Sequence, residues 1–464
     1  MTKKTLFLNG WYFTKQPLGS TLEDIKERKE TFRAVNLPHD WLIYQGKELY
    51  EDSTGWYRKV FSCEKQQDYR YEIYFEGVYM DTTVYLNGQV LGQWKYGYSS
   101  FFFDMTPLLQ EGDNELLVRV NYQAPNSRWY SGAGIYRNVY LRKQPKCHFI
   151  TDSLYITPKK KSEDMWQVEV SAELSQESLN QENSILMVQI LDREGTEVSK
   201  AELPFEKAVN QADGIVTAQI MTQVSNPELW NLEEPYLYHC RLVLKDENKV
   251  LDETKERFGF RIFTFDTDKG FFLNDVHVKL NGVCEHHDFG ALGAVFNKEA
   301  MRRKLEILRK MGVNSIRSTH NMPAIGLLEL ADEMGFLIID EAFDMWERPK
   351  TTYDYARFFP QWYRKDVRSW VRRDRNHPCI LFWSIGNEIY DTHVDARGQE
   401  LTRILMEETR KHDPAYHAQI TIGSNYMPWE NAQKCADIVK YAGYNYGEKY
   451  YDQHHREHPD WFMY

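Results

Sequence analysis

The sequence lacks the features of a membrane protein. It has no run of about 18 to 20 consecutive apolar residues, the length that a membrane-spanning helix needs. Residues 1–11 contain two lysines but no adequate apolar core and no small-residue cleavage site, so they do not resemble a signal peptide. We therefore expect no membrane partner and a cytoplasmic location, although a chain trimmed of its signal would look the same.

Cysteines are few, and they are widely spaced. None of the six forms a CxxC pair, and most lie in apolar, strand-like runs, which argues against a disulfide framework or a cysteine-based metal site. We expect reduced core residues, which also favours the cytoplasm. The six are Cys63, Cys147, Cys240, Cys284, Cys379 and Cys435.

Clustered positive charge is also absent. The net charge is −11 and the pI is near 5.8, whereas proteins that bind the phosphate backbone need grouped Lys and Arg side chains. The one basic cluster of note, at 159–161, lies between two strand-like stretches, where a solvated turn is expected. The sequence therefore predicts no nucleic-acid partner.

The chain is long, and it is rich in aromatic residues. A chain of 464 residues is too long for one ordinary core, so several domains are expected. Aromatic residues make up 14% of the chain, including 13 Trp and 30 Tyr, which exceeds the needs of a plain core. Flat surfaces for stacking on a ligand are therefore expected, and sugar rings are one such ligand.

The first half of the chain, up to about residue 262, has the pattern of two antiparallel β-sandwiches. Residues 71–75, 83–86 and 115–120 alternate with a period of two, and Asn87-Gly88 is a strong signal for a type I′ hairpin. A second set of strand-like segments follows from about 146 to 262, with no long helical pattern. We expect this second set to form an immunoglobulin-like sandwich.

The pattern changes after residue 263. Apolar runs now alternate with amphipathic helical stretches at about 298–311, 322–335, 361–375 and 395–412, which predicts βα units around a parallel sheet. Strands are expected near 278–285, 315–319, 336–340, 379–386, 418–423, 438–444 and 461–464. A (β/α)₈ barrel needs eight strands, so this TIM barrel is predicted to be incomplete at the C-terminus.

Polar residues close four of these predicted strands. The segments are EHHD at 285–288, RSTH at 317–320, DEAFD at 340–344 and GNE at 386–388. Because active sites of βα barrels gather at the C-terminal ends of the strands, these four ends should converge on one rim. They predict a pocket that binds a polyol.

Motifs in all three regions, in the family's order, resemble glycoside hydrolase family 2. WSIGNE at 383–388 is similar to the family's acid/base signature and RSTHNMP at 317–323 to its second-strand motif. RWYSGAGIYR at 128–137, NLPHDW at 36–41 and FGFR at 258–261 also fit. The resemblance implies a jelly-roll-like sugar-binding domain (1–144), an immunoglobulin-like domain (145–263) and a TIM barrel (264–464).

The resemblance assigns the chemistry to Glu388 and Asn387. Retaining hydrolysis needs two carboxyl groups, one of which protonates the departing oxygen, and Glu388 matches that acid/base. Burial and a negative neighbour could keep it protonated; the alternative is an ordinary buried glutamate. Asn387 would hydrogen-bond the sugar 2-hydroxyl, and its alternative is a turn asparagine.

The resemblance also suggests further substrate-binding residues. His286 and His320 match positions that contact substrate hydroxyls or hold the acid/base, while the alternative is core histidines. Asp344 would accept hydrogen bonds from sugar hydroxyls and Trp346 would stack on the sugar ring. The alternative is that both lie on the rim without touching the substrate. Tyr446 ends the sixth strand, where the family often has a tyrosine; the alternative is a core aromatic. The loop at 126–129 could reach the barrel mouth, or pack between domains.

The nucleophile and the metal are the two points where the sequence departs from the family's pattern. The family's nucleophile is a glutamate at the end of the seventh strand, and WFMY at 461–464 resembles the residues directly before it, so we expect that glutamate just beyond Tyr464. Met345 and Glu347 stand where Mg²⁺-dependent relatives have ligands, so no metal and no other cofactor is expected. His454 and His458 lack a third ligand, and a solvated helix face is expected there.

These motifs together predict a retaining exo-β-glycosidase that works by double displacement on a β-glycoside or oligosaccharide. A β-galactoside is the favoured substrate. β-Glucuronidase is the alternative within the family, because the motifs that recognise a uronate lie after the nucleophile. β-Mannosidase is a weaker alternative. A noncatalytic carbohydrate-binding protein is the alternative from another class. A homo-oligomer is compatible with each of these functions.

Overall fold

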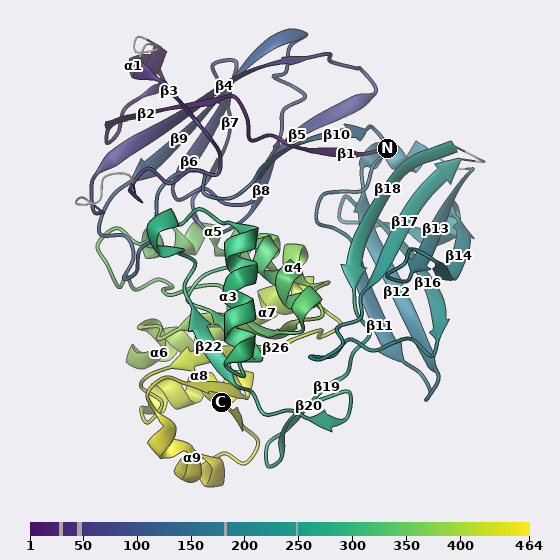
Figure 1. Cartoon of the computed structure of the whole chain (residues 1–464), viewed down its shortest axis with the longest axis vertical. Helices are drawn as coiled ribbons and strands as arrows, with labels where there is room; N and C mark the ends of the chain where they lie inside the picture. The colour runs from purple at the N-terminus through teal and green to yellow at the C-terminus, as the bar shows by residue number, and fades with distance from the viewer. Residues whose placement is uncertain (27–30, 44–48, 181–182, 247–248) are drawn as a thin grey trace.

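The computed structural model describes residues 1–26, 31–43, 49–180, 183–246 and 249–464. Its strands form two antiparallel sandwiches and one parallel sheet surrounded by helices (Figure 1). The first sandwich lies at the top of this view, the second at the right, and the parallel sheet at the lower left. The predicted fold class is confirmed, whereas the residues at which one domain gives way to the next stay a prediction.

The first sandwich consists of a four-stranded and a six-stranded sheet. The four-stranded sheet has the order β1 (Lys3–Leu6), β10 (Val139–Pro145), β5 (Tyr69–Phe75), β8 (Phe101–Asp104). The six-stranded sheet has the order β3 (Arg33–Val35), β2 (Trp11–Pro17), β4 (Ser53–Cys63), β9 (Gly112–Tyr122), β6 (Thr82–Leu86), β7 (Gln89–Trp94). Helix α1 (Leu22–Lys26) follows β2. Asn87 and Gly88 have φ values of 50° and 80°, which a type I′ hairpin requires, so the predicted turn is confirmed.

The second sandwich consists of two four-stranded sheets with its own hydrophobic core. One sheet has the order β11 (Tyr155–Lys160), β12 (Met165–Leu174), β16 (Ile215–Ser225), β15 (Val209–Ala212). The other has the order β14 (Glu197–Pro204), β13 (Ser184–Leu191), β17 (Tyr238–Asp246), β18 (Lys249–Phe258). Helix α2 (Phe205–Ala208) joins β14 to β15. In β12 the residues alternate between partly exposed and buried, because one face of the sheet packs on the core.

A parallel sheet of seven strands follows a small antiparallel sheet. The small sheet contains β19 (Phe263–Asp266), β20 (Gly270–Leu273) and β21 (Val276–His277). The parallel strands run in chain order: β22 (Gly282–Glu285), β23 (Ser315–Ser318), β24 (Leu337–Glu341), β25 (Ile380–Asn387), β26 (Gln419–Ser424), β27 (Tyr441–Tyr444), β28 (Phe462–Met463). Strands β22 and β28 form its edges, so the sheet is open, as predicted for part of a TIM barrel.

The four predicted helices of this region are present. They are α3 (Lys298–Lys310), α4 (Ile325–Met334), α5 (Phe359–Asp374) and α7 (Ala396–His412). Helix α4 begins later than predicted because Pro323 disfavours helical backbone at the preceding residue, and Ala324 is extended. Three further helices, α6 (Asp391–Val394), α8 (Glu430–Val439) and α9 (Tyr451–Glu457), follow β25, β26 and β27.

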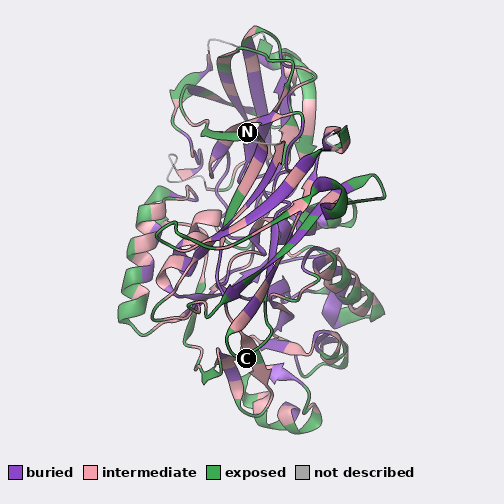
Figure 2. Cartoon of the chain, turned by 90° about the vertical axis from the view of Figure 1, so that its right-hand side faces the viewer, coloured by how far each residue is buried: buried purple, intermediate pink, exposed green. Residues whose placement is uncertain are grey.

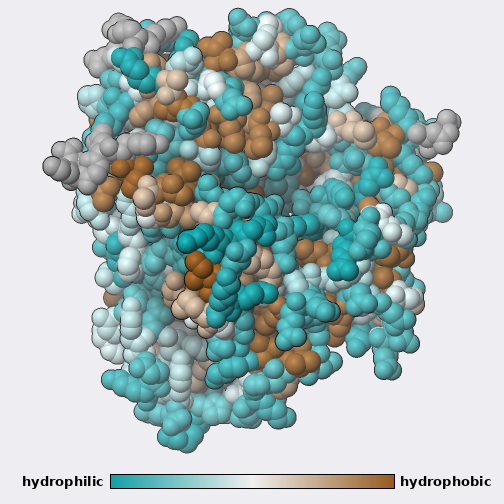
Figure 3. Space-filling view, in the orientation of Figure 1, coloured by the Kyte–Doolittle hydropathy of each residue, from teal (hydrophilic) through white to brown (hydrophobic). Residues whose placement is uncertain are grey.

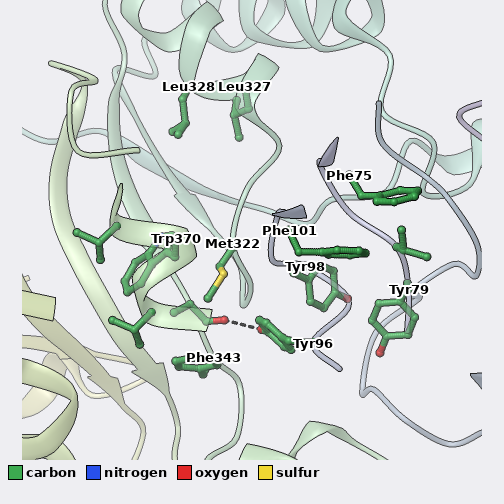
Figure 4. Close-up of a cluster of buried hydrophobic side chains, with 14 of the residues drawn as sticks. Phe75, Tyr79, Tyr96, Tyr98, Phe101, Met322, Leu327, Leu328, Phe343 and Trp370 are labelled. Atoms are coloured by element: carbon green, nitrogen blue, oxygen red, sulfur yellow. Dashed lines mark hydrogen bonds between the residues drawn. The ribbon is translucent and has the colours of Figure 1, made fainter. Parts of the chain in front are cut away.

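The first sandwich and the parallel sheet share one hydrophobic core. Tyr96 packs on Phe343 with ring centroids 5.4 Å apart, and its hydroxyl donates a hydrogen bond to the Ala342 carbonyl (Figure 4). Arg137 is buried and donates to the carbonyls of Met322 and Pro323. These contacts fix the loops of the first sandwich against the C-terminal ends of the parallel strands.

Burial follows the predicted patterns. The strands are largely buried and the outer faces of the helices are exposed (Figure 2). Hydrophobic side chains appear as separate patches on a mostly hydrophilic surface (Figure 3). Among the described residues, no helix is both long and apolar enough to cross a membrane. All six cysteines are free, although Cys284 is exposed and Cys63 half-buried rather than in the core.

Candidate active site

Glu388 lies directly after β25, near the middle of the parallel sheet. Its backbone N–H donates to the Gly423 carbonyl of β26 at 2.7 Å, and its φ of 46° turns the chain sharply at this point. The carboxylate accepts hydrogen bonds from Asn445 Nδ2 at 3.0 Å and from Arg128 at 3.3 Å. Among the described residues, the charged group that touches Glu388 is the Arg128 guanidinium, and the negative neighbour stays a prediction.

Asn387 connects Glu388 to the neighbouring strand ends. Its side-chain amide donates to Asp344 Oδ1 at 2.8 Å, and its Oδ1 accepts from Arg317 and Asn445, each at 2.8 Å. The side chain is fully buried. Donors and acceptors from three strand ends thus fix the orientation of the residue that precedes the candidate acid.

Asp344 is held by two cations. Arg128 reaches it with two hydrogen bonds, of 2.7 and 3.0 Å, and the Lys350 ammonium lies 2.8 Å away. Burial alone would raise the pKa of Asp344, but the two cations hold it below its usual value. Lys350 also donates to the Asn387 carbonyl at 2.8 Å. Burial lowers the pKa of its ammonium despite the neighbouring Asp344.

Arg128 comes from the first sandwich, so the loop at 126–129 does reach the barrel mouth. In the same loop, Trp129 lies over His286 with ring centroids 4.2 Å apart and is 6.1 Å from the His320 ring. A small cavity of about 30 Å³ lies among Trp129, His320 and Asp344. The first sandwich therefore forms one wall of the site.

Glu341 and His320 form a second buried cluster next to the first. His320 Nδ1 lies 2.7 Å from Glu341, and Arg317 contacts the same carboxylate at 2.7 and 3.0 Å. Ser384 donates to it at 2.7 Å. Although burial opposes this, Arg317 and His320 keep the pKa of Glu341 below its usual value, so it is a carboxylate.

His286 faces His320 at a ring-centroid distance of 5.6 Å. Burial, with His320 nearby, lowers the pKa of His286. Its Nδ1 is buried and has no hydrogen-bond partner among the described residues, so a hydroxyl could bind there. The next residue, His287, is engaged instead, because its Nε2 lies 3.0 Å from the Ser131 carbonyl.

Two predicted binding residues are not placed beside the others. Trp346 is 0% exposed and donates its indole N–H to the Ile385 carbonyl at 2.9 Å, so the expectation that it stacks on a sugar is wrong. It fills the space beside Gly386, where a Cβ atom would lie 3.1 Å from the indole ring. Tyr446 is 87% exposed on the loop after β27, so it is not a core aromatic, and its binding role stays a prediction.

Lys350 is the site residue that the sequence analysis missed. It lies in the loop between β24 and α5, where no periodic pattern shows which side chain turns inward. Asn445, which donates to Asn387 and Glu388, was not singled out either. The one signal available for Lys350 was its proximity in sequence to Asp344.

Met345 and Glu347, which stand where Mg²⁺-dependent relatives have metal ligands, do not form a Mg²⁺ site. The Met345 side chain offers no oxygen, and Glu347 is paired with Arg397 at 3.0 Å. Among the described residues, one group has metal-like spacing: Asp332, His377 and Cys379. It lies at the opposite end of β25, where the His377–Asp332 pair and the bond from the Cys379 N–H to Asp332 at 3.2 Å account for it structurally.

His454 does not have the environment that the sequence predicted. It is buried rather than on a solvated face, and its Nδ1 lies 2.9 Å from the Tyr444 hydroxyl. His458 stacks on Trp461 at 3.8 Å. The helix α9 is short, and these rings anchor it to the end of the sheet.

This arrangement can be compared with known proteins. Three family descriptions match consecutive parts of the chain: the family 2 sugar binding domain at 24–145, glycosyl hydrolases family 2 at 148–261, and the family 2 TIM barrel domain at 266–458. The chain belongs to glycoside hydrolase family 2. The family 2 resemblance inferred from the motifs is thereby confirmed.

Two curated relatives and one solved structure show how far the similarity extends. Beta-galactosidase BoGH2A of Bacteroides ovatus is 41% identical over 384 residues, 80% of this chain and 45% of its own length. A putative β-glucuronidase of Formosa agariphila is 35% identical, over 84% of this chain and 38% of its own. A family 2 member from Bacteroides cellulosilyticus superposes with a TM-score of 0.90 at 31% identity, covering 99% of this chain and 61% of that one. The chain thus spans about half the length of the curated relatives it matches.

Proposed function

We propose that the protein is a retaining family 2 exo-β-glycosidase in which Glu388 is the general acid/base. The observation that carries this proposal is the position of Glu388 at the C-terminal end of β25, buried and flanked by Asn387. Active sites of this fold gather at that end of the strands. The converging Asp344, His320 and His286 provide polar groups that suit a polyol.

The chemistry follows from these positions. Glu388 donates a proton to the oxygen of the departing group, and later takes one from the water that releases the sugar. Asn387 is oriented by its bonds to Asp344 and Arg317, and the amide hydrogen that these bonds do not use is proposed to bind the sugar 2-hydroxyl as the glycosidic bond breaks. Arg128 contacts Glu388 only at 3.3 Å, so a leaving-group oxygen can compete for that carboxylate.

Neither of the other two carboxylates in the site is suited to be the nucleophile. A retaining enzyme needs a nucleophile about 5 to 5.5 Å from the acid. Asp344 is bound by Arg128 and Lys350, and Glu341 by Arg317 and His320, so neither carboxylate is free to attack the anomeric carbon. A glutamate after the seventh strand, expected from the resemblance, stays our prediction for this role.

The proposed substrate is a terminal β-galactoside, as favoured from the sequence. The relative named as a β-galactosidase at 41% identity supports it. A β-glucuronide is the second candidate, because a relative at 35% identity is named as a putative β-glucuronidase. Comparing nitrophenyl β-galactoside with nitrophenyl β-glucuronide on the whole protein decides between them.

Replacement of Glu388 by Gln tests the proposal. We expect turnover of glycosides with poor leaving groups to fall by several orders of magnitude, and turnover of activated aryl glycosides to fall far less, because only the former need the proton. Added azide should speed the variant and yield the β-glycosyl azide, since the anion enters where the base is missing. The matched control is Glu347→Gln, an ion-paired glutamate on the neighbouring loop.

Equal losses on both classes of substrate, without azide rescue, would remove Glu388 from this role. A protein that binds oligosaccharides but hydrolyses none of the panel would support the noncatalytic alternative instead. Binding can be followed by calorimetry with the same sugars, so the two functions are distinguished on one preparation.

A further inference from the structure

Three aromatic side chains stand exposed on two loops beside Glu388. Tyr390 lies two residues after Glu388 and is 43% exposed. Tyr426 and Trp429, between β26 and α8, are 39% and 52% exposed. We call these three side chains the rim platform. Most large rings of this chain are buried, so a group of exposed rings at the catalytic end of the sheet indicates a binding surface.

The rim platform is held in place by its surroundings. The rings of Tyr426 and Trp429 lie 4.4 Å apart at 30°, and the His393 ring packs edge-on against Tyr426 at 4.6 Å. Asn431 donates to the Val394 carbonyl at 3.0 Å, which ties α8 to α6. The rings are therefore ordered before any ligand binds, which lowers the entropy cost of stacking.

Two buried polar atoms beside the rim platform have no hydrogen-bond partner among the described residues. They are Nε2 of His393 and Oδ1 of Asn425. Buried polar atoms are normally satisfied, so each indicates a missing partner. Burial lowers the pKa of His393 to about 4, so the ring is neutral at pH 7 and can donate or accept. Sugar hydroxyls also do both.

The rim platform adjoins the leaving-group side of the candidate acid. The Glu388 N–H bonds the carbonyl of Gly423, two residues before Asn425. The Lys350 ammonium lies 5.8 Å from the Tyr390 ring and 2.8 Å from the Asn387 carbonyl, so Tyr390 is close to the residue preceding Glu388. A general acid stands beside the oxygen that departs, so a group attached to that oxygen can reach these loops.

We propose that the rim platform, together with His393 and Asn425, binds the sugar unit on the leaving-group side of the scissile bond. This inference rests on the proposed function and adds to it the substrate class, an oligosaccharide rather than a glycoside of a small alcohol. A pyranose ring presents apolar C–H groups to an aromatic face and hydroxyls at its edge. Those two features match the exposed rings and the two unpartnered atoms.

The test compares two substrates on the whole protein carrying Trp429→Ala. One is an oligosaccharide whose terminal, β-linked sugar is the one that the wild type releases. The other is the β-fluoride of that same sugar, in which the leaving group is fluoride and has no ring to stack. We expect kcat/KM for the oligosaccharide to fall about tenfold or more, the loss expected for one aromatic stacking contact. For the fluoride it should change by less than about twofold.

Two control variants complete the design. Trp429→Phe keeps a ring and should retain most of the oligosaccharide activity. Tyr416→Ala removes a ring that is 58% exposed at the opposite end of β26, and should change neither rate. Unchanged oligosaccharide activity in Trp429→Ala, or equal losses on both substrates, overturns the inference. A wild type that cleaves no glycosyl fluoride overturns the proposed function as well, so the two failures are distinguishable.

Discussion

At the scale of single residues, Asp344 connects the parts of the site. It bonds to Arg128 from the first sandwich, to Lys350 from the loop after β24, and to Asn387 from β25. These segments are far apart in the sequence, and one carboxylate brings them together. The orientation of Asn387, and with it the backbone turn into Glu388, therefore depends on how Asp344 is held.

We predict that Lys350→Met lowers both activity and stability. The Lys350 side chain is 0% exposed, and its removal leaves a buried carboxylate with one cation fewer and the Asn387 carbonyl without its donor. Breaking a buried ion pair costs about 3 to 5 kcal/mol; Arg128 remains, so we expect the lower end of this range. The free energy of unfolding and kcat/KM on an aryl glycoside measure the two effects.

The matched control for Lys350→Met is Lys365→Met. Lys365 is exposed on α5 and packs over the Trp362 ring at 4.2 Å, away from the strand ends. We expect little change in either quantity. A similar loss of stability in both variants would show that the buried contacts of Lys350 are not its source.

At the scale of elements, the parallel strands explain which site residues could be predicted. Parallel strands place their C-terminal ends at one edge, so the motifs that close β23, β24 and β25 had to meet. His320, Asp344 and Asn387 do so. That these three residues lie close together follows from strand order, which the alternation of apolar runs and helices had indicated.

Loop side chains could not be predicted in this way. Sequence spacing does not show which residue of the loop after β24 turns inward, so Lys350 was missed and Trp346 was expected to stack on the sugar. A Cβ atom at Gly386 would lie 2.6 Å from Ile389 and 3.1 Å from the Trp346 ring, so the glycine leaves room for both side chains. A glycine in an otherwise bulky, buried strand was the available signal.

Helix ends supply a test at the same scale. Gly335 follows α4 with φ of 68°, and a Cβ atom there would lie 2.4 Å from the Leu232 carbonyl oxygen, a backbone atom of the second sandwich. Gly312 follows α3 with φ of 84° and has nothing within 4 Å. The two glycines share the left-handed backbone but not the steric environment.

We predict that Gly335→Ala destabilises the protein more than Gly312→Ala. Both variants bear the cost of left-handed backbone at alanine, about 1 to 2 kcal/mol. Only in Gly335→Ala does the new methyl group also clash with the Leu232 carbonyl, so the end of α4 or the second sandwich must shift. Thermal unfolding of the two variants side by side measures the difference, and equal midpoints would show that the backbone contact yields without cost.

At the scale of the whole molecule, the first sandwich is part of the architecture of the candidate site. Trp94 and Ser99 donate to Asp366 of α5 at 3.0 and 2.7 Å, and Arg137 bonds the loop before α4. The same docking carries Arg128 and Trp129 to the strand ends. The sequence motif at 128–137 located this segment, but its contacts follow from packing between distant elements, which no local pattern encodes.

The anchor at Asp366 should make the docking of the first sandwich sensitive to pH. Burial raises the pKa of Asp366 to about 7, although Tyr355, Ser99 and Trp94 donate to it and oppose that shift. An exposed aspartate in the unfolded chain has a pKa of about 3.9. Between these values the folded protein holds a proton that the unfolded chain releases, so this contribution to stability is complete below about pH 4 and is lost as the pH rises through about 7.

We therefore predict that Asp366→Asn, which cannot lose this proton, gains stability relative to the wild type as the pH rises from 5 to 8. The slope should approach about 1.4 kcal/mol per pH unit below pH 7 and flatten above it. Unfolding midpoints of both proteins across this range measure it, with Asp68→Asn as the control, since the Asp68 side chain is 91% exposed. Parallel midpoint curves for wild type and Asp366→Asn would show that this carboxyl is already ionised in the fold, and that the docking of the first sandwich does not depend on its proton.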